Sequence, residues 1–296
     1  MAPFLLVLAL TLWVCALFLG FGLLLHAAAA DFNPSPSLGE SIYHAADSFL
    51  TLGVSRAAVQ GWAQIIVTFA GMVGLANVTV VASYLLSVQT ELNHREVLVL
   101  RTEVAAGRPP TGLGLLESFA RTGMTDQLAT LFLDWEHWSA HVLHTHRANP
   151  ILCHFRSADE DGEWLAVFGA VLDAANLVRS LVRRDGLEAA HAAAILFSAV
   201  GTRTEDLAEL MQLSPGSANS NQAEVGPELA RARSRLAGVG YHVVDDMAGA
   251  TAHFLEGAGR YHGFIAALCD HLAIRTALQL DDVHATEQMR AELSAG

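Results

Sequence analysis

The chain opens with an apolar run that contains no Asp, Glu, Lys or Arg, and a second run without formal charge follows after a short polar interval. The first extends from Pro3 to Leu25 and the second from Ala57 to Thr90. About 20 consecutive apolar residues cross the ~30 Å hydrocarbon layer of a bilayer, so both runs are long enough. Backbone polar groups inside lipid must be paired within the segment, which makes such runs helices. The sequence therefore predicts transmembrane helices near residues 3–28 and 60–90.

The first run has a second interpretation as a cleaved secretory signal, because the small residues Ala27–Ala30 follow it. A signal peptide carries basic residues ahead of an apolar core of about 7–15 residues. This run is longer and has no basic residue. A retained membrane span is therefore favoured.

The interval Ser37–Arg56 is too short and too polar to cross a bilayer by itself. It begins with Ser37-x-x-Glu40, the spacing of a capping box at a helix start. About three helical turns follow, and a segment of small residues begins at Thr51. The interval suits either a re-entrant helix over residues 38–50 or a plain connector between two spans. Non-helical backbone at membrane depth must be buried in protein or line a water-filled path.

Polar and small residues of the second run recur at steps of three and four, so they share one helix face. Such a face suits a bundle interior or an aqueous cavity, or ordinary packing of small residues between helices. Glycine also weakens a helix and permits a bend. The residues on this face are Gln64, Thr68, Gly71, Leu75, Thr79 and Ser83, and the candidate bend lies at Gly71 and Gly74.

Several segments together resemble a known family. The pore-like part is a span, a short helix, Thr51-Leu52-Gly53-Val54 and a glycine-containing second span. The other segments are Arg95–Val97, Ala105–Pro110, Asp134–Trp138, His146, Pro150, Phe155–Ser157 and Trp164–Leu165, with a weaker match over Tyr261–Asp270. They resemble bacterial two-transmembrane pore-loop potassium channels, described as two-pore-domain-type potassium channel family proteins.

The resemblance implies a homotetrameric channel in the cell membrane, with the bilayer as its surroundings and K⁺ or another monovalent cation as the transported ion. No other cofactor is implied. Backbone carbonyls of a selectivity filter replace the water shell of the ion. Gly71 and Gly74 would permit gating of the inner helix. The filter would be Thr51, Leu52, Gly53, Val54 and Ser55, with Arg56 at the pore mouth.

The filter departs from the potassium pattern at three consecutive residues. Val54 replaces an aromatic residue, and Arg56 replaces an outer aspartate. Ser55 replaces a glycine that can adopt a positive φ, where serine would be strained. A positive ring at the mouth lowers the local concentration of cations. Two functions remain open: a cation channel of ordinary or altered selectivity, and a non-conducting membrane-anchored sensor or interaction protein that keeps the pore scaffold.

Three arginines (Arg95, Arg101 and Arg108) follow the second span, whereas Arg56 alone lies between the spans. The positive-inside rule therefore predicts a multi-pass protein with both termini in the cytoplasm. Most of the formal charge of −13 lies after residue 110, and an acidic surface argues against nucleic-acid binding. The predicted layout is an all-α membrane protein with a pore module (1–92), a connector (93–113) and a cytoplasmic helical domain (114–296).

The predicted cytoplasmic domain is a helical bundle that gates the pore. Its helices are expected near 114–122, 125–147, 163–184, 187–200, 204–213, 227–238, 242–257, 260–274 and 283–293. The residues Ser214–Gly226 are expected to form a loop. No motif of a catalytic site accompanies these helices, so the chain is not expected to be an enzyme.

Three histidines, His137, His141 and His144, have spacing that places them on one helical face. This face suits either a transition-metal site or a solvated surface. For His146 a buried structural hydrogen bond is expected. Arg156 suits either an exposed ion pair or a pocket for an unidentified small-molecule or ion regulator.

Overall fold

The computed structural model of the chain describes residues 2–55, 57–157, 163–183, 188–215 and 222–274. It divides into two compact units, Met1–Thr90 (unit 1) and Glu91–Gly296 (unit 2). In these ranges the chain is helical apart from short loops, one pair of two-residue strands and one isolated bridge. The predicted all-α class is therefore confirmed. The helix expected near 283–293 lies outside the described residues.

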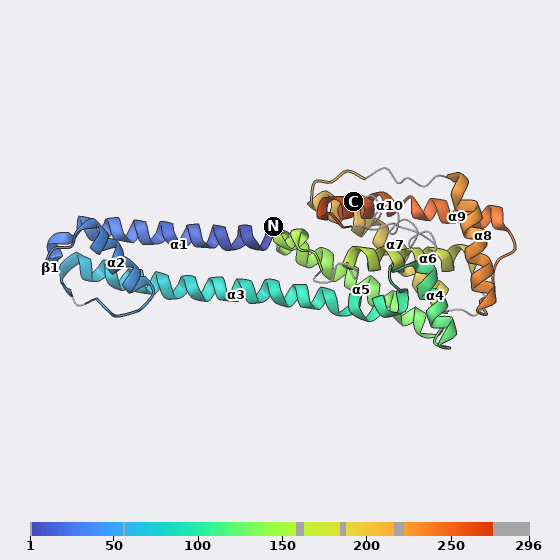
Figure 1. The fold of residues 1–296 in the computed structure, drawn as a ribbon, viewed down its shortest axis with the longest axis horizontal. Coiled ribbons are helices and arrows are strands. Elements are labelled where there is room, and N and C mark those ends of the chain that lie inside the picture. The colour runs from blue at the N-terminus through green and yellow to red at the C-terminus, as the bar shows by residue number, and fades with distance from the viewer. Residues whose placement is uncertain (1, 56, 158–162, 184–187, 216–221, 275–296) are drawn as a thin grey trace, which may run out of the picture. The chain divides into compact units, whose positions relative to one another are not determined.

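Unit 1 is a hairpin of two long helices with a short helix packed against them (Figure 1). The first long helix, α1, is followed by a turn of 3-10 helix and strand β1, and α2 precedes strand β2 and the second long helix, α3. The bounds are α1 Ala2–Ala27, η1 Ala29–Asp31, β1 Phe32–Asn33, α2 Leu38–Phe49, β2 Ala58–Val59 and α3 Gly61–Ala106. Helix α3 continues into unit 2, so most of the predicted connector 93–113 is helical.

Local capping explains where the helices of unit 1 begin. The Ser37 hydroxyl accepts from the Glu40 amide, and the Glu40 carboxylate accepts from the Ser37 amide at 2.7 Å, which confirms the predicted capping box. At the start of α3, the Asp31 carboxylate accepts from the Ala63 amide at 3.1 Å. A carboxylate at that position also faces the positive end of the helix dipole. The strands pair antiparallel, Phe32 opposite Val59, and bring Asp31 to this position.

The core of unit 1 lies where α2 meets the two long helices. Phe49 at the end of α2 is buried and meets Phe18 of α1 edge to face, with 5.2 Å between the ring centroids. A Cβ on Gly22 of α1 would lie 2.6 Å from Ile42, so these two helices require glycine there. The other buried apolar residues of this cluster are Phe21, Leu25, Phe32, Ala45, Ala63 and Ala70.

Three helices in the described ranges are long and apolar enough to span a membrane, and their burial separates them into two kinds. The segments are Val7–Ala27 of α1, the apolar part of α3, and Trp164–Leu181, which is helix α6. Only 11% of the residues in the first two windows are buried, against 89% for α6. Helices apolar on all sides are buried in protein or in lipid. The helices α1 and α3 therefore mark this chain as a membrane-associated protein, whereas α6 is the centre of unit 2.

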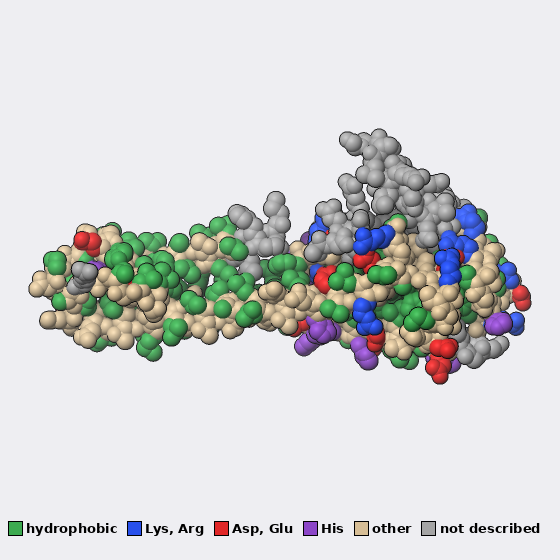
Figure 2. Space-filling view, turned by 60° about the horizontal axis from the view of Figure 1, so that its bottom comes forward, with side chains coloured by type: hydrophobic (Ala, Val, Ile, Leu, Met, Phe, Trp, Pro, Cys, Tyr) green, Lys and Arg blue, Asp and Glu red, His purple; other side chains and the backbone are tan. Residues whose placement is uncertain are grey.

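Unit 2 is a bundle around α6, which contacts α4, α5, α7, α9 and α10. Its helices are α4 Gly112–Arg121, α5 Gln127–Ala148, η2 Pro150–His154, α6 Trp164–Leu181, α7 Glu188–Leu210, α8 Gln222–Gly238, α9 Met247–Ala258 and α10 His262–Leu272. In the space-filling view, charged and histidine side chains gather on the surface of this unit, whereas the visible face of unit 1 shows hydrophobic side chains and few charged ones (Figure 2). This surface fits a domain exposed to water.

The helix boundaries of unit 2 differ from the predicted ones in three places. One helix, α7, replaces the two expected at 187–200 and 204–213, because Leu196, Val200 and Leu207 are buried along one continuous face. That burial outweighs the roughly 1 kcal/mol cost of Gly201 within the helix. Helix α8 begins at Gln222, inside the expected loop, and α9 begins at Met247, where the Asp246 carboxylate accepts from the Gly249 amide.

Candidate functional site

The predicted filter segment follows the end of α2 directly. The helix ends at Phe49, and Thr51 and Gly53 then adopt positive φ angles of 54° and 69°. Glycine takes this conformation without steric cost, whereas a β-branched residue such as Thr51 is strained in it. Ser55 is not among the positive-φ residues, so the expected strain at Ser55 is wrong. The turn needed here is made earlier, at Thr51 and Gly53. Arg56, the predicted pore-mouth residue, lies outside the described residues.

The buried carboxylate of Asp47 in α2 accepts hydrogen bonds from the backbone of this segment. Its Oδ1 accepts from the Val54 amide at 2.9 Å and its Oδ2 accepts from the Ser55 amide at 3.2 Å. The Ser55 hydroxyl also lies 2.7 Å from Nδ1 of His44, whose ring stacks on Phe32. Hydrogen bonds to an ionised acceptor are about twice as strong as neutral ones. Asp47 therefore fixes the backbone direction of residues 54 and 55.

The carbonyl groups of this segment are left available. Within the described parts of the chain, no carbonyl from Thr51 to Ser55 accepts a hydrogen bond, whereas four amides of the segment donate. The amides of Thr51 and Leu52 donate to Ser48 and Asp47 carbonyls at 3.1 and 2.9 Å. Exposed side chains of Leu52 and Val54 flank these carbonyls. A backbone with its amides satisfied and its carbonyls free can act as a row of cation ligands.

The two glycines of the predicted bend lie directly against the backbone at the end of α2. A Cβ added to Gly74 would overlap the Phe49 carbonyl oxygen and lie 2.6 Å from its carbon. At Gly71 it would lie 3.4 Å from the Ser48 carbonyl oxygen. Helix α3 is continuous through both residues. The structure thus assigns these glycines a role in packing, and their role in gating stays a prediction.

Polar side chains of the face predicted on the second span are exposed in the single chain. Gln64, Thr68 and Thr79 are exposed, and the hydroxyls of both threonines donate to carbonyls one turn earlier at 2.9 Å. A concavity of about 360 Å³ lies on this part of α3. It is lined by Gln64, Ile65, Thr68, Phe69 and Met72.

A second polar cluster lies inside unit 2, where the predicted family-like segments meet. The Arg95 guanidinium is buried and donates to the Glu96 carboxylate at 2.9 Å and to the Phe155 carbonyl at 3.2 Å. It also lies over the Trp164 ring, 4.9 Å from the centroid. The Glu96 carboxylate in turn accepts from the Ser157 hydroxyl at 2.9 Å. The end of α3 is therefore tied to the start of α6 by charge-assisted contacts.

Arg156 belongs to the same cluster through Glu163. The Glu163 carboxylate is buried, and it accepts from the Arg156 guanidinium at 2.6 Å and from the Ser157 amide at 3.0 Å. Arg156 itself is partly exposed. The ion pair expected at Arg156 is therefore present, but its carboxylate partner is buried, and the pair holds the segment before α6. A regulator pocket at Arg156 stays a prediction.

His146 is buried beside this cluster, which confirms the predicted structural hydrogen bond. Its Nδ1–H donates to the Val142 carbonyl at 2.7 Å. Burial, followed by the charge of Arg95, lowers the pKa of His146 to about 4. Burial also raises the pKa of the nearby Cys153 thiol to about 11. Both groups are therefore uncharged at neutral pH.

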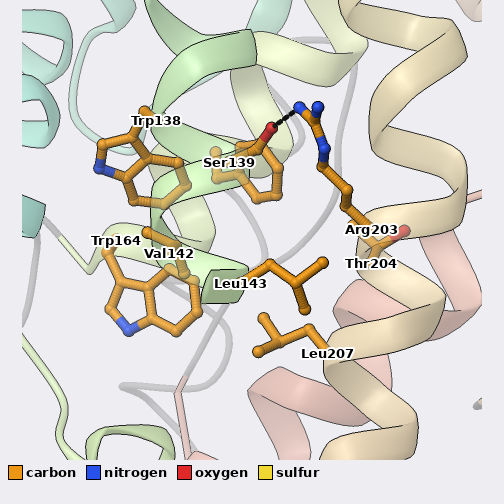
Figure 3. Close-up of a pocket in the computed structure, with 9 residues that line it drawn as sticks. Trp138, Ser139, Val142, Leu143, Trp164, Arg203, Thr204 and Leu207 are labelled. Atoms are coloured by element: carbon orange, nitrogen blue, oxygen red, sulfur yellow. Dashed lines mark hydrogen bonds between the residues drawn. The ribbon is translucent and has the colours of Figure 1, made fainter. Parts of the chain in front are cut away.

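A small cavity lies between α5, α6 and α7, beside Trp164. It holds about 10 Å³, which is room for one water molecule at most. Figure 3 shows Trp138 and Trp164 on one side and Leu143 and Leu207 on the other, with Arg203 of α7 reaching Ser139 of α5. The Arg203–Ser139 hydrogen bond is 2.9 Å long. This arrangement is a packed helix contact.

The three histidines predicted as a candidate metal site do not form one. His137 is exposed and lies 3.8 Å from Glu136, whereas His141 lies 2.8 Å from Glu91 of α3. His144 is exposed. In the part of the chain that the structure describes, no group of three His, Cys, Asp or Glu side chains could hold a metal ion. The face is a solvated surface with one interhelical pair.

Sequence reasoning missed a row of buried polar residues on α6. The Asp173 carboxylate accepts from the Tyr261 hydroxyl at 2.5 Å and lies 2.9 Å from Nε2 of His262. Burial, and then Asp173, raise the pKa of Tyr261 well above its ordinary value. One turn on, the Asn176 amide donates to the Phe254 carbonyl at 2.9 Å. These contacts orient α9 and α10 on α6, and the polar residues in an otherwise apolar helix were the available signal.

Comparison with protein-family models, with curated proteins and with solved structures gives no match.

Proposed function

We propose that this protein is a tetrameric pore-loop cation channel in a cell membrane, with Thr51–Ser55 of four chains forming the ion path. The observation that carries the proposal is the geometry of this segment: four of its five amides donate to Asp47 or to the Ser48 carbonyl, and none of its carbonyls accepts a hydrogen bond from a described residue. Four such strands around one axis would supply rings of carbonyl oxygens, which replace the hydration shell of a K⁺ ion or another monovalent cation.

Two electrostatic features support cation passage. The carboxyl end of α2 points toward the segment, and the partial negative charge of a helix C-terminus favours a cation nearby. The buried Asp47 carboxylate adds a formal negative charge directly behind Val54 and Ser55. An acidic residue near a helix C-terminus is unfavourable for the helix itself. Its position here is explained by its contact with the loop.

The channel proposal also implies an arrangement in the membrane. Helices α1 and α3 would cross the bilayer with α2 re-entrant between them, and both termini would lie in the cytoplasm. Unit 2 would then be a cytoplasmic gating domain, joined to the pore through the continuous helix α3. Its buried Arg95–Glu96–Ser157 contacts would transmit movements of the bundle to that helix.

The test is ion flux through purified protein in liposomes under a potassium gradient. We expect flux that Thr51→Ala or Gly53→Ala reduces at least tenfold, because both positions shape the carbonyl row. Gly39→Ala is the matched control, since a Cβ there has nothing within 4 Å. Equal flux in all four proteins, or no flux in any of them, would contradict the proposal.

The alternative is a non-conducting sensor or interaction protein that keeps the pore scaffold. The sequence favours it at one point, where Val54, Ser55 and Arg56 replace the usual filter residues. Restoring all three together, as Val54→Tyr, Ser55→Gly and Arg56→Asp, separates the two functions. A silent parent and a conducting triple variant would assign the protein to the alternative.

A further inference from the structure

Beyond the apolar run, four residues of α3 form an exposed face that is apolar in three positions. Val97, Leu100 and Val104 are 58%, 54% and 88% exposed, and Asn93 is exposed as well. We call these four residues the α3 seam. The opposite face of the same helix is buried in unit 2 through Arg95, Val99 and Thr102. One side of this part of α3 is thus packed in its own domain, while the seam is left uncovered by the described residues.

The spacing of the seam is that of a coiled coil. Residues 93, 97, 100 and 104 follow each other at steps of four, three and four, which is the a/d pattern of a heptad. The same steps continue back along α3 through Thr90, Leu86, Ser83 and Thr79, all of them exposed. The stripe therefore runs without a break from the predicted span into unit 2.

Lipid cannot cover the seam as it covers the span. An α-helix rises 1.5 Å per residue, so Val97 and Val104 lie about 10 and 20 Å beyond Thr90. Two charged residues lie between the apolar run and Val97: Glu91 directly follows the run, and Glu96 directly precedes Val97. Contiguous apolar surface in water marks an interaction site.

We propose that the α3 seam binds the same seam of a second copy of this chain, with the two helices parallel and in register. The direction rests on the proposed function, because chains inserted in one bilayer with one orientation present α3 in parallel. Valine at both a positions with leucine at d is the pattern that favours two parallel strands. Four chains would then pair two by two below the membrane.

The residues that flank the seam complement this arrangement. Arg101 occupies an e position and is exposed, and Glu96 occupies a g position and is about one quarter exposed. In a parallel coiled coil a g residue faces the e residue of the following heptad on the other helix. Glu96 would therefore face the partner's Arg101, which would share a carboxylate that already accepts from Arg95 and Ser157. Asn93 occupies the other d position of the seam.

Cysteine cross-linking of the full-length protein in liposomes tests the proposal. The three native cysteines are first replaced by alanine (Cys15→Ala, Cys153→Ala, Cys269→Ala), and Leu100→Cys is introduced. Residue 100 meets its own copy only in a parallel, in-register pair. Under copper phenanthroline and air, we expect disulfide-linked dimers of Leu100→Cys to form at least tenfold faster than those of Ile195→Cys. Ile195 is a matched control, because it is an apolar residue of α7 with 52% exposure.

A second variant separates contact at the seam from random collision. Adding Val104→Glu to Leu100→Cys is expected to slow cross-linking at least tenfold, whereas adding Ile195→Glu leaves it unchanged. Equal rates for residues 100 and 195, or no dimer at residue 100, would overturn the proposal and assign the seam to another occupant. Ion flux is measured separately, so a cross-linking protein without flux keeps the seam and loses the channel. Flux without cross-linking at residue 100 keeps the channel and overturns the seam.

Discussion

Helices α1 and α6 are both long and apolar, yet they have opposite surroundings. Only 11% of the α1 window is buried in the protein, against 89% of α6. Helix α6 also carries polar residues, Asp173, Asn176 and Ser180, and these are buried with hydrogen-bond partners on α9 and α10 or beside them. In the described part of α1, the helix depends on apolar contacts with α2 along one side and exposes apolar side chains elsewhere. Buried polar pairing, more than hydropathy, therefore distinguishes α6 from α1.

The largest effect is expected from removing the buried carboxylate of the half-buried Arg156–Glu163 pair in unit 2. Glu163→Ala leaves the Ser157 amide and the Arg156 guanidinium without their acceptor, and should lower the free energy of unfolding by about 3–5 kcal/mol. Glu256→Ala is the control, because its pair with Arg260 is exposed and such pairs contribute about 0–1 kcal/mol. Denaturant unfolding followed by the fluorescence of Trp135, Trp138 and Trp164 measures both. Equal losses would show that burial does not set the strength of these pairs.

Truncating one leucine in each helix tests the comparison directly. Leu172→Ala in α6 removes a fully buried side chain and should cost about 2–5 kcal/mol. Leu24→Ala in α1 removes a side chain that is 54% exposed, which detergent or lipid covers, and should cost less than about 1 kcal/mol. Thermal and denaturant unfolding of the full-length protein in the same detergent gives both values. A larger loss for Leu24 would mean that α1 is covered by protein.

The pH dependence of unit 2 should reveal His146. Its pKa is about 4 in the folded protein against about 6.5 unfolded, so the unfolded chain binds the proton more tightly. The free energy of unfolding is therefore unaffected by this group above pH 6.5. It decreases as the pH falls from 6.5 toward 4, by up to roughly 3 kcal/mol. His146→Gln should flatten the unfolding profile in this window. His144→Gln, on the exposed face of the same helix, should leave the profile of the parent protein; a shared change would refute the assignment to His146.

The smallest effect is expected at the contact between α2 and α3 in unit 1. Gly74→Ala places a methyl group against the Phe49 carbonyl and should destabilise the unit by about 1–3 kcal/mol. Gly20→Ala in α1 has open space around it and should be neutral or slightly stabilising, since alanine favours a helix. The melting temperature in detergent compares the two. Destabilisation by Gly20→Ala alone would contradict the packing described for this unit.

The sequence by itself determined the features that depend on local chemistry. Long uncharged apolar runs must be helices, and Ser37 with Glu40 satisfies the free amides of a helix start wherever that helix lies. The all-α class, the helix near 38–50 and the buried hydrogen bond of His146 were therefore predictable. These properties belong to single residues and their near neighbours in the chain.

The tertiary structure decided the features that depend on residues distant in sequence. The hydropathy of α6 does not say that protein rather than lipid surrounds it, because its polar residues Asp173 and Asn176 find their partners only through the packing of α9 and α10. Asp47 accepts from amides seven and eight residues further along the chain, and these contacts depend on how the chain turns at Thr51 and Gly53. Likewise, Gly74 is required by the Phe49 carbonyl of another helix, and His141 of α5 pairs with Glu91 of α3. Such contacts are set by the complete packing of the chain, which local propensity does not encode.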